Sequence, residues 1–200
     1  MTRFARLGLL LLMTGAVASC QTLSKEECQI ADWEVIGRND GAAGYNPQDR
    51  FAGHVKACSR IGVAPDQTLW QRGFDQGLRN YCTPMNGLAA GRAGKSYANV
   101  CPGNSSEGFL RGYNLGKSAY AKEDEIRRIE SSIRSLEYEI SRLEKDARKE
   151  SDRLRLEQIY NDIRSNERRI GDYRRDIDRL RFELDGIEED INLFSANAGR

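Results

Sequence analysis

Two apolar heptad series in the C-terminal part of this 200-residue chain constrain its fold more than any other feature. In both, apolar residues recur at alternating steps of three and four between charged neighbours, which is typical of a coiled coil. The first series is Ile126, Ile129, Ile133, Leu136, Ile140, Leu143 and Ala147. The second is Leu156, Ile159, Ile163, Asn166, Ile170, Tyr173, Ile177, Leu180, Leu184, Ile187, Ile191 and Phe194. We therefore expect a coiled coil over residues 121–195 and a short tail over 196–200.

The two series do not share one frame, which predicts a bend between them. Ala147 and Leu156 are nine residues apart, a spacing that fits neither of the usual heptad slips of three or four. The bend should lie between Lys145 and Arg155, at Ser151-Asp152. A straight helix of about seventy residues would reach roughly 105 Å and need another chain, whereas a hairpin would supply its own partner.

Charge pairing favours the hairpin. A parallel homodimer of the second series would place like charges at three of its four flanking pairs. An antiparallel register with Ile133 opposite Leu180 instead places opposite charges together, although it puts the turn near residues 155–158, where no turn former occurs. The attractive pairs in that register are Glu130 with Arg181 and Glu137 with Arg174, but it also sets Glu144 near Glu167. Asn166 among the core positions is expected to define the register, and homo-oligomerisation stays open.

The N-terminal residues carry the features of an export signal. Arg3 and Arg6 precede an apolar run over residues 7–17, which is too short to span a bilayer but suits a signal peptide. Val17-Ala18-Ser19-Cys20 follows and resembles a bacterial lipobox, in which the cysteine thiol receives a diacylglycerol group. We expect a signal peptide over 1–19 and a tether over 20–27 lipidated at Cys20, the alternative being an ordinary secretory signal cleaved after Ser19. By resemblance to lipoprotein sorting in Gram-negative bacteria, Gln21 favours the outer membrane.

The remaining cysteines predict a disulfide framework. Cys28, Cys58, Cys82 and Cys101 form an even set in an exported domain, which reads as two disulfides with three possible connectivities. We favour Cys28–Cys58 with Cys82–Cys101, because each bridge would close one of two adjacent subunits of the domain, but spacing alone leaves the choice open. Zinc is disfavoured, since no C-x-x-C pair occurs and His54 is the only histidine.

Helical glycines dominate the middle segment. Four stretches place glycines four residues apart, on one face of a helix, and three of them recur at intervals of 36 and 39 residues. Glycine costs about 1 kcal/mol relative to alanine in a helix, so its gain must be close approach of another helix or an aromatic ring. The glycines are Gly37, Gly41, Gly73, Gly77, Gly87, Gly91, Gly112 and Gly116. We expect residues 28–120 to form four or five short helices, with one starting at Pro47 and the next at Pro65-Asp66. The predicted fold is all-α: a small, disulfide-linked, glycine-rich domain of short helices, followed by a long coiled coil folded as a helical hairpin.

Three motifs of this segment carry a family resemblance. Residues 33–44 read W-x-x-x-G-x-x-D-G-x-x-G, residues 70–82 read W-x-x-G-x-x-x-G-L-x-x-Y-C, and residues 87–102 read G-x-x-x-G-x-x-G-x-x-Y-x-x-V-C-P. Over residues 28–120 the chain resembles the domain-of-unknown-function family numbered 2799, a group of Gram-negative envelope lipoproteins. The family's pattern leads us to expect tyrosine where this chain has Trp70. The resemblance implies an envelope lipoprotein and implies no substrate or catalytic residue.

Candidate chemical groups are few and have simpler interpretations. His54 could act in catalysis only beside a nucleophile or a carboxylate such as Asp40 or Asp75, and packing is the commoner role of a lone histidine. The two aspartates are expected to cap helices or to pair with Arg38 and Arg79. Asn39-Asp40-Gly41 does not continue as a calcium loop. Trp33 and Trp70 could line a sugar-stacking groove, but core aromatics packed on glycine are the favoured interpretation.

These observations predict a protein that binds rather than catalyses. The 31 basic and 30 acidic residues leave a net charge of +1, which gives no electrostatic footprint for nucleic acid. We expect a non-enzymatic envelope lipoprotein without metal or cofactor, anchored to the outer membrane through Cys20 and facing the periplasm. It would act as a structural or protein-interaction module whose partner is an envelope protein. The alternative is a module that binds a glycan or peptide of the cell wall.

Overall fold

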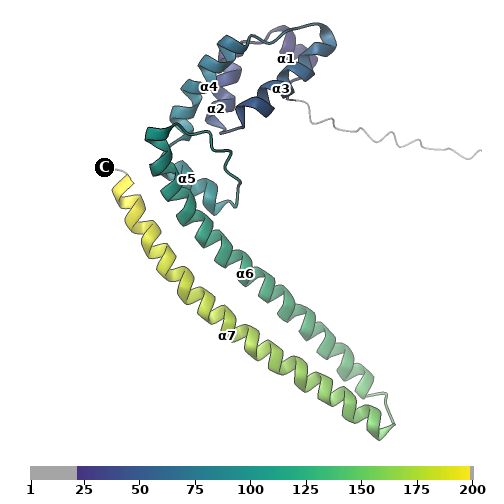
Figure 1. Ribbon diagram of the computed structural model, residues 1–200. Helices are drawn as coiled ribbons and strands as arrows, with labels where there is room; N and C mark the ends of the chain where they lie inside the picture. Colours follow the sequence, from purple (N-terminus) through teal and green to yellow (C-terminus); the bar gives the residue numbers. More distant parts are fainter. Residues whose placement is uncertain (1–21, 199–200) are drawn as a thin grey trace, which may run out of the picture.

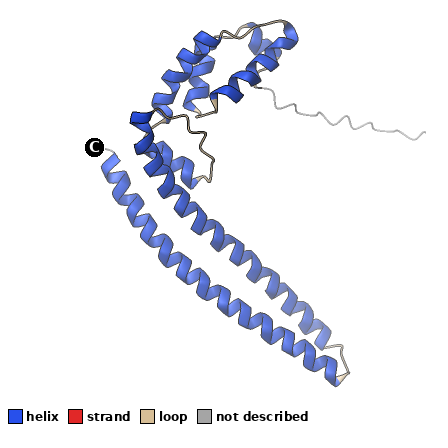
Figure 2. Ribbon diagram, viewed as in Figure 1, coloured by secondary structure: helices blue, strands red, loops and turns tan. Residues whose placement is uncertain are grey.

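The computed structural model describes residues 22–198, which form helices and connecting loops with no strand among them (Figure 2). The helices are α1 (Lys25–Gln29), α2 (Trp33–Ala42), α3 (Pro47–Cys58), a 3-10 turn (Ser59–Ile61), α4 (Gln67–Tyr81), α5 (Pro84–Arg92), α6 (Gly103–Ala147) and α7 (Arg153–Ala198). The all-α prediction is confirmed: a glycine-rich domain of short helices is followed by a long hairpin of α6 and α7 (Figure 1). None of the described helices has the length and hydropathy required to cross a membrane.

Local capping signals set most of the helix starts. The side chain of Asn46 accepts the backbone N–H of Asp49, with Pro47 in the first helical position, so α3 begins where the sequence predicts. Asp66 caps α4 in the same way through the backbone N–H of Leu69. Ser24 and Glu27 form a capping box on α1, so the expected tether over 20–27 is helical from Lys25.

The first glycine-faced pair consists of α2 and α4. The four glycines of this pair lie where the helices touch, and a methyl group on any of them would overlap a backbone atom of the opposite helix. Gly37 faces the carbonyl oxygen of Trp70, and Gly73 faces that of Glu34. Backbone-to-backbone approach at this distance is open only to glycine, which explains residues that are unfavourable for helix formation itself.

A second pair, formed by α5 and the first turns of α6, repeats the first. Gly87 faces the carbonyl oxygen of Phe109 as Gly37 faces that of Trp70, and Gly112 faces that of Pro84 as Gly73 faces that of Glu34. The equivalences on the first helix, 50 residues apart in the sequence, are Gly37 with Gly87, Gly41 with Gly91 and Gly44 with Gly94. Those on the second helix, 39 residues apart, are Trp70 with Phe109, Gly73 with Gly112, Gly77 with Gly116 and Tyr81 with Tyr120.

The positive-φ turns complete this correspondence. Gly44 has φ +70° and packs on the ring of Tyr81, while Gly94 has φ +66° and packs on the ring of Tyr120. The repeating unit is therefore a pair of helices plus its turn. The 36-residue interval in the sequence separates the two partners within one unit, Gly37 and Gly73, whereas the 39-residue interval relates equivalent helices of the two units, at Gly73 and Gly112.

The two units differ in what connects their helices. In the first, the connection contains α3, which packs beside α1 and carries the Cys28–Cys58 disulfide, with a Cα–Cα distance of 5.5 Å. In the second, a loop from Ala93 to Pro102 replaces α3 and is bonded back through Cys82–Cys101, also with a Cα–Cα distance of 5.5 Å. The favoured pairing of the four cysteines is thus the one in the structure.

Helices α6 and α7 form the predicted hairpin, running side by side (Figure 1). Their turn covers residues 148–152, inside the interval expected from the frame break, whereas the position near residues 155–158 inferred from the register is wrong. A side chain rather than a turn-forming residue type stabilises this turn, because the Glu150 carboxylate accepts the backbone N–H groups of Ser151 and Asp152 at 2.8 and 2.9 Å. Asp152 then accepts the backbone N–H of Arg155 at 2.9 Å and starts α7.

Both expected cross-helix ion pairs form in the hairpin. Arg181 lies 3.5 Å from Glu130, and Arg174 lies 3.5 Å from Glu137. Asn166 is buried in the seam, at 7% exposure. The register therefore follows from the positions of apolar and charged residues that the sequence already shows.

The end of α7 returns to the glycine-rich domain and covers the second unit (Figure 1). Leu88 and Ala119 of this unit are buried against Ile191, with Arg92 of α5 ion-paired to Glu188 of α7. In the first unit the position of Leu88 is taken by the exposed Arg38. The apolar outer face of the second unit is thus what the returning helix covers. Helix α6 is continuous through residue 120, where the sequence suggests a boundary between domain and coiled coil.

Candidate functional site

The side chains that could support chemistry come together in a buried network around Asp40. Its Oδ1 accepts a hydrogen bond from Arg50 Nε at 2.6 Å. Its Oδ2 lies 2.7 Å from His54 Nε2 and accepts a hydrogen bond from Trp70 Nε1 at 3.0 Å. Asp40 itself is 3% exposed, so these three donors replace the water that a free carboxylate would bind.

The hydrogen bonds set the charge of this network. Burial by itself would raise the pKa of Asp40, but the hydrogen bonds from His54, Trp70 and Arg50 outweigh it and hold the pKa below its ordinary value of 3.8. Asp40 is therefore an anion at neutral pH. An ionised carboxylate can only accept, so His54 carries its proton on Nε2.

His54 is enclosed and cannot reach a dissolved substrate. Its exposure is 0%, its ring lies between those of Trp33 and Trp70 at centroid distances of 6.3 and 6.4 Å, and its Nδ1 has no hydrogen-bond partner among the described residues. The pair meets the distance requirement of a histidine–carboxylate dyad but not its access requirement. The network is therefore a set of buried hydrogen bonds that connects α2, α3 and α4.

The other candidate residues lie elsewhere. Asp75 is exposed and accepts a hydrogen bond from Gln71 at 2.8 Å, so the structure does not bring it together with His54. The expected partners of the two aspartates, Arg38 and Arg79, are wrong: Asp40 pairs with Arg50, which the sequence places on the next helix. Trp33 and Trp70 are both buried, at 8% and 1% exposure, and form core rather than an open stacking surface.

No group of three or more His, Cys, Asp or Glu side chains within residues 22–198 is arranged to hold a metal ion. The four bonded cysteines are engaged in the two disulfides. Cys20, the expected lipidation site, and the signal peptide over 1–19 lie outside the described residues.

A cleft lies between the two units, beside the second disulfide. Its volume is about 830 Å³, within the size range of small-ligand sites. The floor is apolar, with Phe74, Leu78 and Val100, and the rim carries Asp75 and Arg79. Amide side chains also line it, at Asn46, Gln48, Gln71, Asn99 and Asn104. Asn99 has φ +55°, a left-handed conformation that non-glycine residues seldom adopt and that is common at functional loops.

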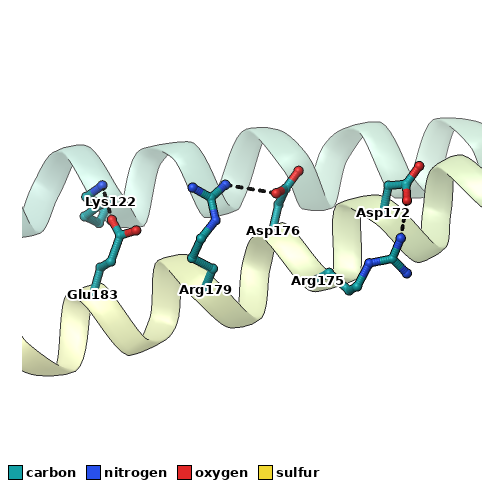
Figure 3. Close-up of polar contacts among 6 residues, drawn as sticks. All are labelled: Lys122, Asp172, Arg175, Asp176, Arg179 and Glu183. Carbon is teal, nitrogen blue, oxygen red and sulfur yellow. Dashed lines mark hydrogen bonds and ion pairs between the residues drawn. The ribbon is translucent and has the colours of Figure 1, made fainter.

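The hairpin carries exposed ion pairs, both between its two helices and along α7. Lys122 of α6 pairs with Glu183 of α7 at 2.5 Å across the hairpin, whereas Arg179 pairs with Asp176 at 2.9 Å along α7 (Figure 3). Arg175 pairs with Asp172 in the same way (Figure 3). Exposed pairs of this kind contribute only about 0–1 kcal/mol each, so they are better suited to selecting a partner or a register than to holding the fold.

Comparison with known families assigns the glycine-rich domain. The family model described as "Protein of unknown function (DUF2799)" matches residues 32–118, which confirms the resemblance seen in the sequence motifs. The matched residues span both glycine-faced units, from the cap of α2 into α6. The hairpin beyond residue 118 lies outside the match. Neither the curated proteins nor the solved structures include a significant match to the chain.

The sequence did not reveal the Asp40 network, although one signal for it was present. Asp40 lies in a glycine-faced helix, at a position equivalent to Ala90 of the second unit. Only the first unit contains α3, which supplies both Arg50 and His54. A charged residue at a position that holds alanine in the other unit therefore indicates where the additional helix, α3, is bound.

Proposed function

We propose that this protein is a non-enzymatic lipoprotein of the outer membrane, facing the periplasm and acting as a structural or protein-interaction module. The observation that carries the proposal is the hairpin. After residue 120, α6 continues for 27 residues, or about 40 Å, beside α7. The sides of the two helices away from the seam are charged and exposed along this length. Such an arm provides a long, charged, exposed surface rather than an enclosed site, and this suits contact with another envelope protein.

The Asp40–His54 network supports a non-enzymatic role. A catalytic dyad must reach its substrate, and this one is buried, with the rings of Trp33 and Trp70 beside His54. Its contribution is to stability, because it connects three helices at the centre of the first unit. The lipobox at Cys20 supports the anchor, since several acyl chains together hold a protein firmly to a bilayer.

Cross-linking in intact cells tests this function. A photoreactive phenylalanine analogue at Tyr138, which is 76% exposed on the hairpin, is expected to form discrete adducts with another envelope protein. The matched control is the same analogue at Ile30, which is 85% exposed on the domain and should give no discrete adduct. Adducts only at Ile30 would contradict the role given to the hairpin. In the same cells, Cys20→Ser should remove the lipid mass and the membrane fractionation of the protein, and an unchanged mass and fractionation would refute the anchor.

The cleft favours a second candidate function, the binding of a cell-wall peptide. Its amide-rich rim can pair with peptide groups, and neighbouring Asp75 and Arg79 offer one charge of each sign to a ligand that carries both an amine and a carboxylate. Purified peptidoglycan should then retain the wild-type chain. We expect Arg79→Ala to reduce retention at least about fivefold, and Arg72→Ala, on the same helix outside the cleft, to leave it unchanged. If the folded chain is not retained at all, this second function is excluded.

A further inference from the structure

The chain is packed onto the glycine-rich domain from Thr22 onward. The methyl group of Thr22 lies against Gly53 of α3, where an added Cβ would be 2.7 Å from it. Leu23 packs against the core of the first unit, and the first disulfide then bonds α1 to the end of α3. Residues 22–28 therefore run along residues 53–58 in the same direction.

The link between this packed segment and the proposed lipid anchor is only two residues long. Cys20 and Thr22 have Cα atoms at most about 7 Å apart in any conformation of the chain. One headgroup layer of a bilayer is about 5–8 Å thick, so the link is no longer than that layer. If acyl chains on Cys20 lie in the bilayer, as the proposed function requires, the side of the domain next to Thr22 must lie at the headgroups.

Helix α1 presents an exposed isoleucine on this side of the domain. Cys28 is directed toward α3 by its disulfide, and Glu26 and Ile30 lie on the opposite side of α1 at a spacing of four residues. Ile30 is 85% exposed, the highest value among the large hydrophobic residues that the structure describes. A headgroup layer can cover such a side chain, and the carboxylate of Glu26 one turn earlier keeps α1 at the level of the headgroups.

We propose that α1 and the adjoining edge of α3 rest on the periplasmic leaflet of the outer membrane, with Ile30 inserted among the lipid headgroups. The partner of this surface is thus the bilayer to which the chain is anchored. Helix α1 lies at one end of the molecule and the turn of the α6–α7 hairpin at the other (Figure 1). The charged surface of the hairpin therefore stays available to the proposed envelope partner.

The charges beside this surface balance one another. The exposed ionisable side chains of α1, of the edge of α3 that carries Gly53 and of the turn after it comprise three cations and three anions. They are Lys25, Glu26, Glu27, Asp49, Lys56 and Arg60. A balanced surface gains little from anionic lipids, whose attraction depends on an excess of basic residues. The short link, rather than electrostatic attraction, is therefore what holds the surface at the membrane.

Fluorescence quenching by brominated lipids tests the contact on the lipidated chain. An environment-sensitive fluorescent amino acid replaces Ile30, and the purified protein is reconstituted in vesicles of phosphatidylethanolamine and phosphatidylglycerol. Bromine near the headgroup end of the acyl chains should reduce the emission at least about twofold relative to unbrominated vesicles. Because the surface charges balance, we expect the same reduction in vesicles of phosphatidylcholine alone.

Two comparisons show whether the short link causes the contact. The same fluorescent residue at Val55, which is 42% exposed on the side of α3 away from Gly53, is the matched control and should not be quenched. Twelve glycine and serine residues inserted between Gln21 and Thr22 should remove most of the quenching at Ile30, because they add about 20 Å of flexible chain.

The mass of the purified protein separates this inference from the anchor on which it rests. A lipidated chain with no quenching at Ile30 would overturn the membrane contact and leave the anchor intact. Equal quenching with and without the inserted residues, or equal quenching at Ile30 and Val55, would also overturn it. A chain that lacks the lipid mass would refute the anchor at Cys20 and the contact together.

Discussion

Gly73→Ala is expected to separate α2 from α4 and to unfold the glycine-rich domain. A methyl group at this position would overlap the carbonyl oxygen of Glu34 and lie 2.9 Å from the backbone nitrogen of Arg38. Neither atom belongs to a flexible side chain, so the two helices must move apart along their whole contact. Overpacking of this kind costs about 3 kcal/mol or more, a large part of the stability of a small domain. Urea denaturation followed by circular dichroism measures the loss.

The same change at Gly186 of α7 is the matched control. A methyl group on Gly186 would meet no atom within 4 Å, so Gly186→Ala should stabilise the chain by up to about 1 kcal/mol through helix propensity alone. The two substitutions thus share their chemistry and differ in sign. Equal urea midpoints for the two variants would show that the glycines do not act through close approach.

Asp40→Asn should cause the second large loss of stability, about 3 kcal/mol at neutral pH. The neutral amide removes the charge that holds Arg50 and leaves an NH₂ group among donors that need an acceptor. Arg50 is about one quarter exposed and can recover some hydration, so the expected loss is at the lower end for a broken buried ion pair. Asp75→Asn, at an exposed carboxylate, is the control and should change the free energy of unfolding by less than about 0.5 kcal/mol.

The pH dependence of stability gives this prediction a second measurement. Because the pKa of Asp40 is lowered in the folded state, its contribution is present above its ordinary pKa and is lost as the pH falls through the lowered value. Wild-type stability should therefore decline below about pH 4, and Asp40→Asn should show a smaller decline. Glu27, whose pKa is lowered by the backbone N–H and hydroxyl of Ser24, leaves a residual slope in the variant. Parallel acid profiles for the two proteins would contradict the role assigned to Asp40.

The two glycine-faced units share one helix pairing but are stabilised in different ways. In the first unit the connection between the two helices contains α3, which forms the Asp40 network. The outer face of this unit is polar, and there Glu34 accepts a hydrogen bond from Gln76 at 3.0 Å. The second unit has the shorter loop, and its outer face is apolar and covered by the end of α7. One half is thus stabilised from within, and the other by the hairpin. The two units therefore bury their glycine-faced helix pairs in different ways.

The sequence by itself determined those features that depend on local periodicity. Heptads at steps of three and four define an apolar seam in any context, and the frame break between Ala147 and Leu156 required the turn that the structure shows. Opposite charges then selected Glu130 and Glu137 as partners of α7, because pairs at one seam follow from residue spacing alone. Caps such as Asn46 and Asp66 are equally local, since donor and acceptor are three residues apart.

Only the tertiary structure decided which surfaces meet. Glycines at four-residue spacing predict the close approach of another helix but do not indicate which helix it is. The pairing of α2 with α4 and of α5 with α6 is therefore visible only in the structure. The Asp40 network joins residues 10, 14 and 30 positions away in the sequence, and no pattern of period two or 3.6 links such separations. The return of α7 onto Leu88 and Ala119 likewise depends on the full length of the hairpin, which brings the last turns of the chain back to the second unit.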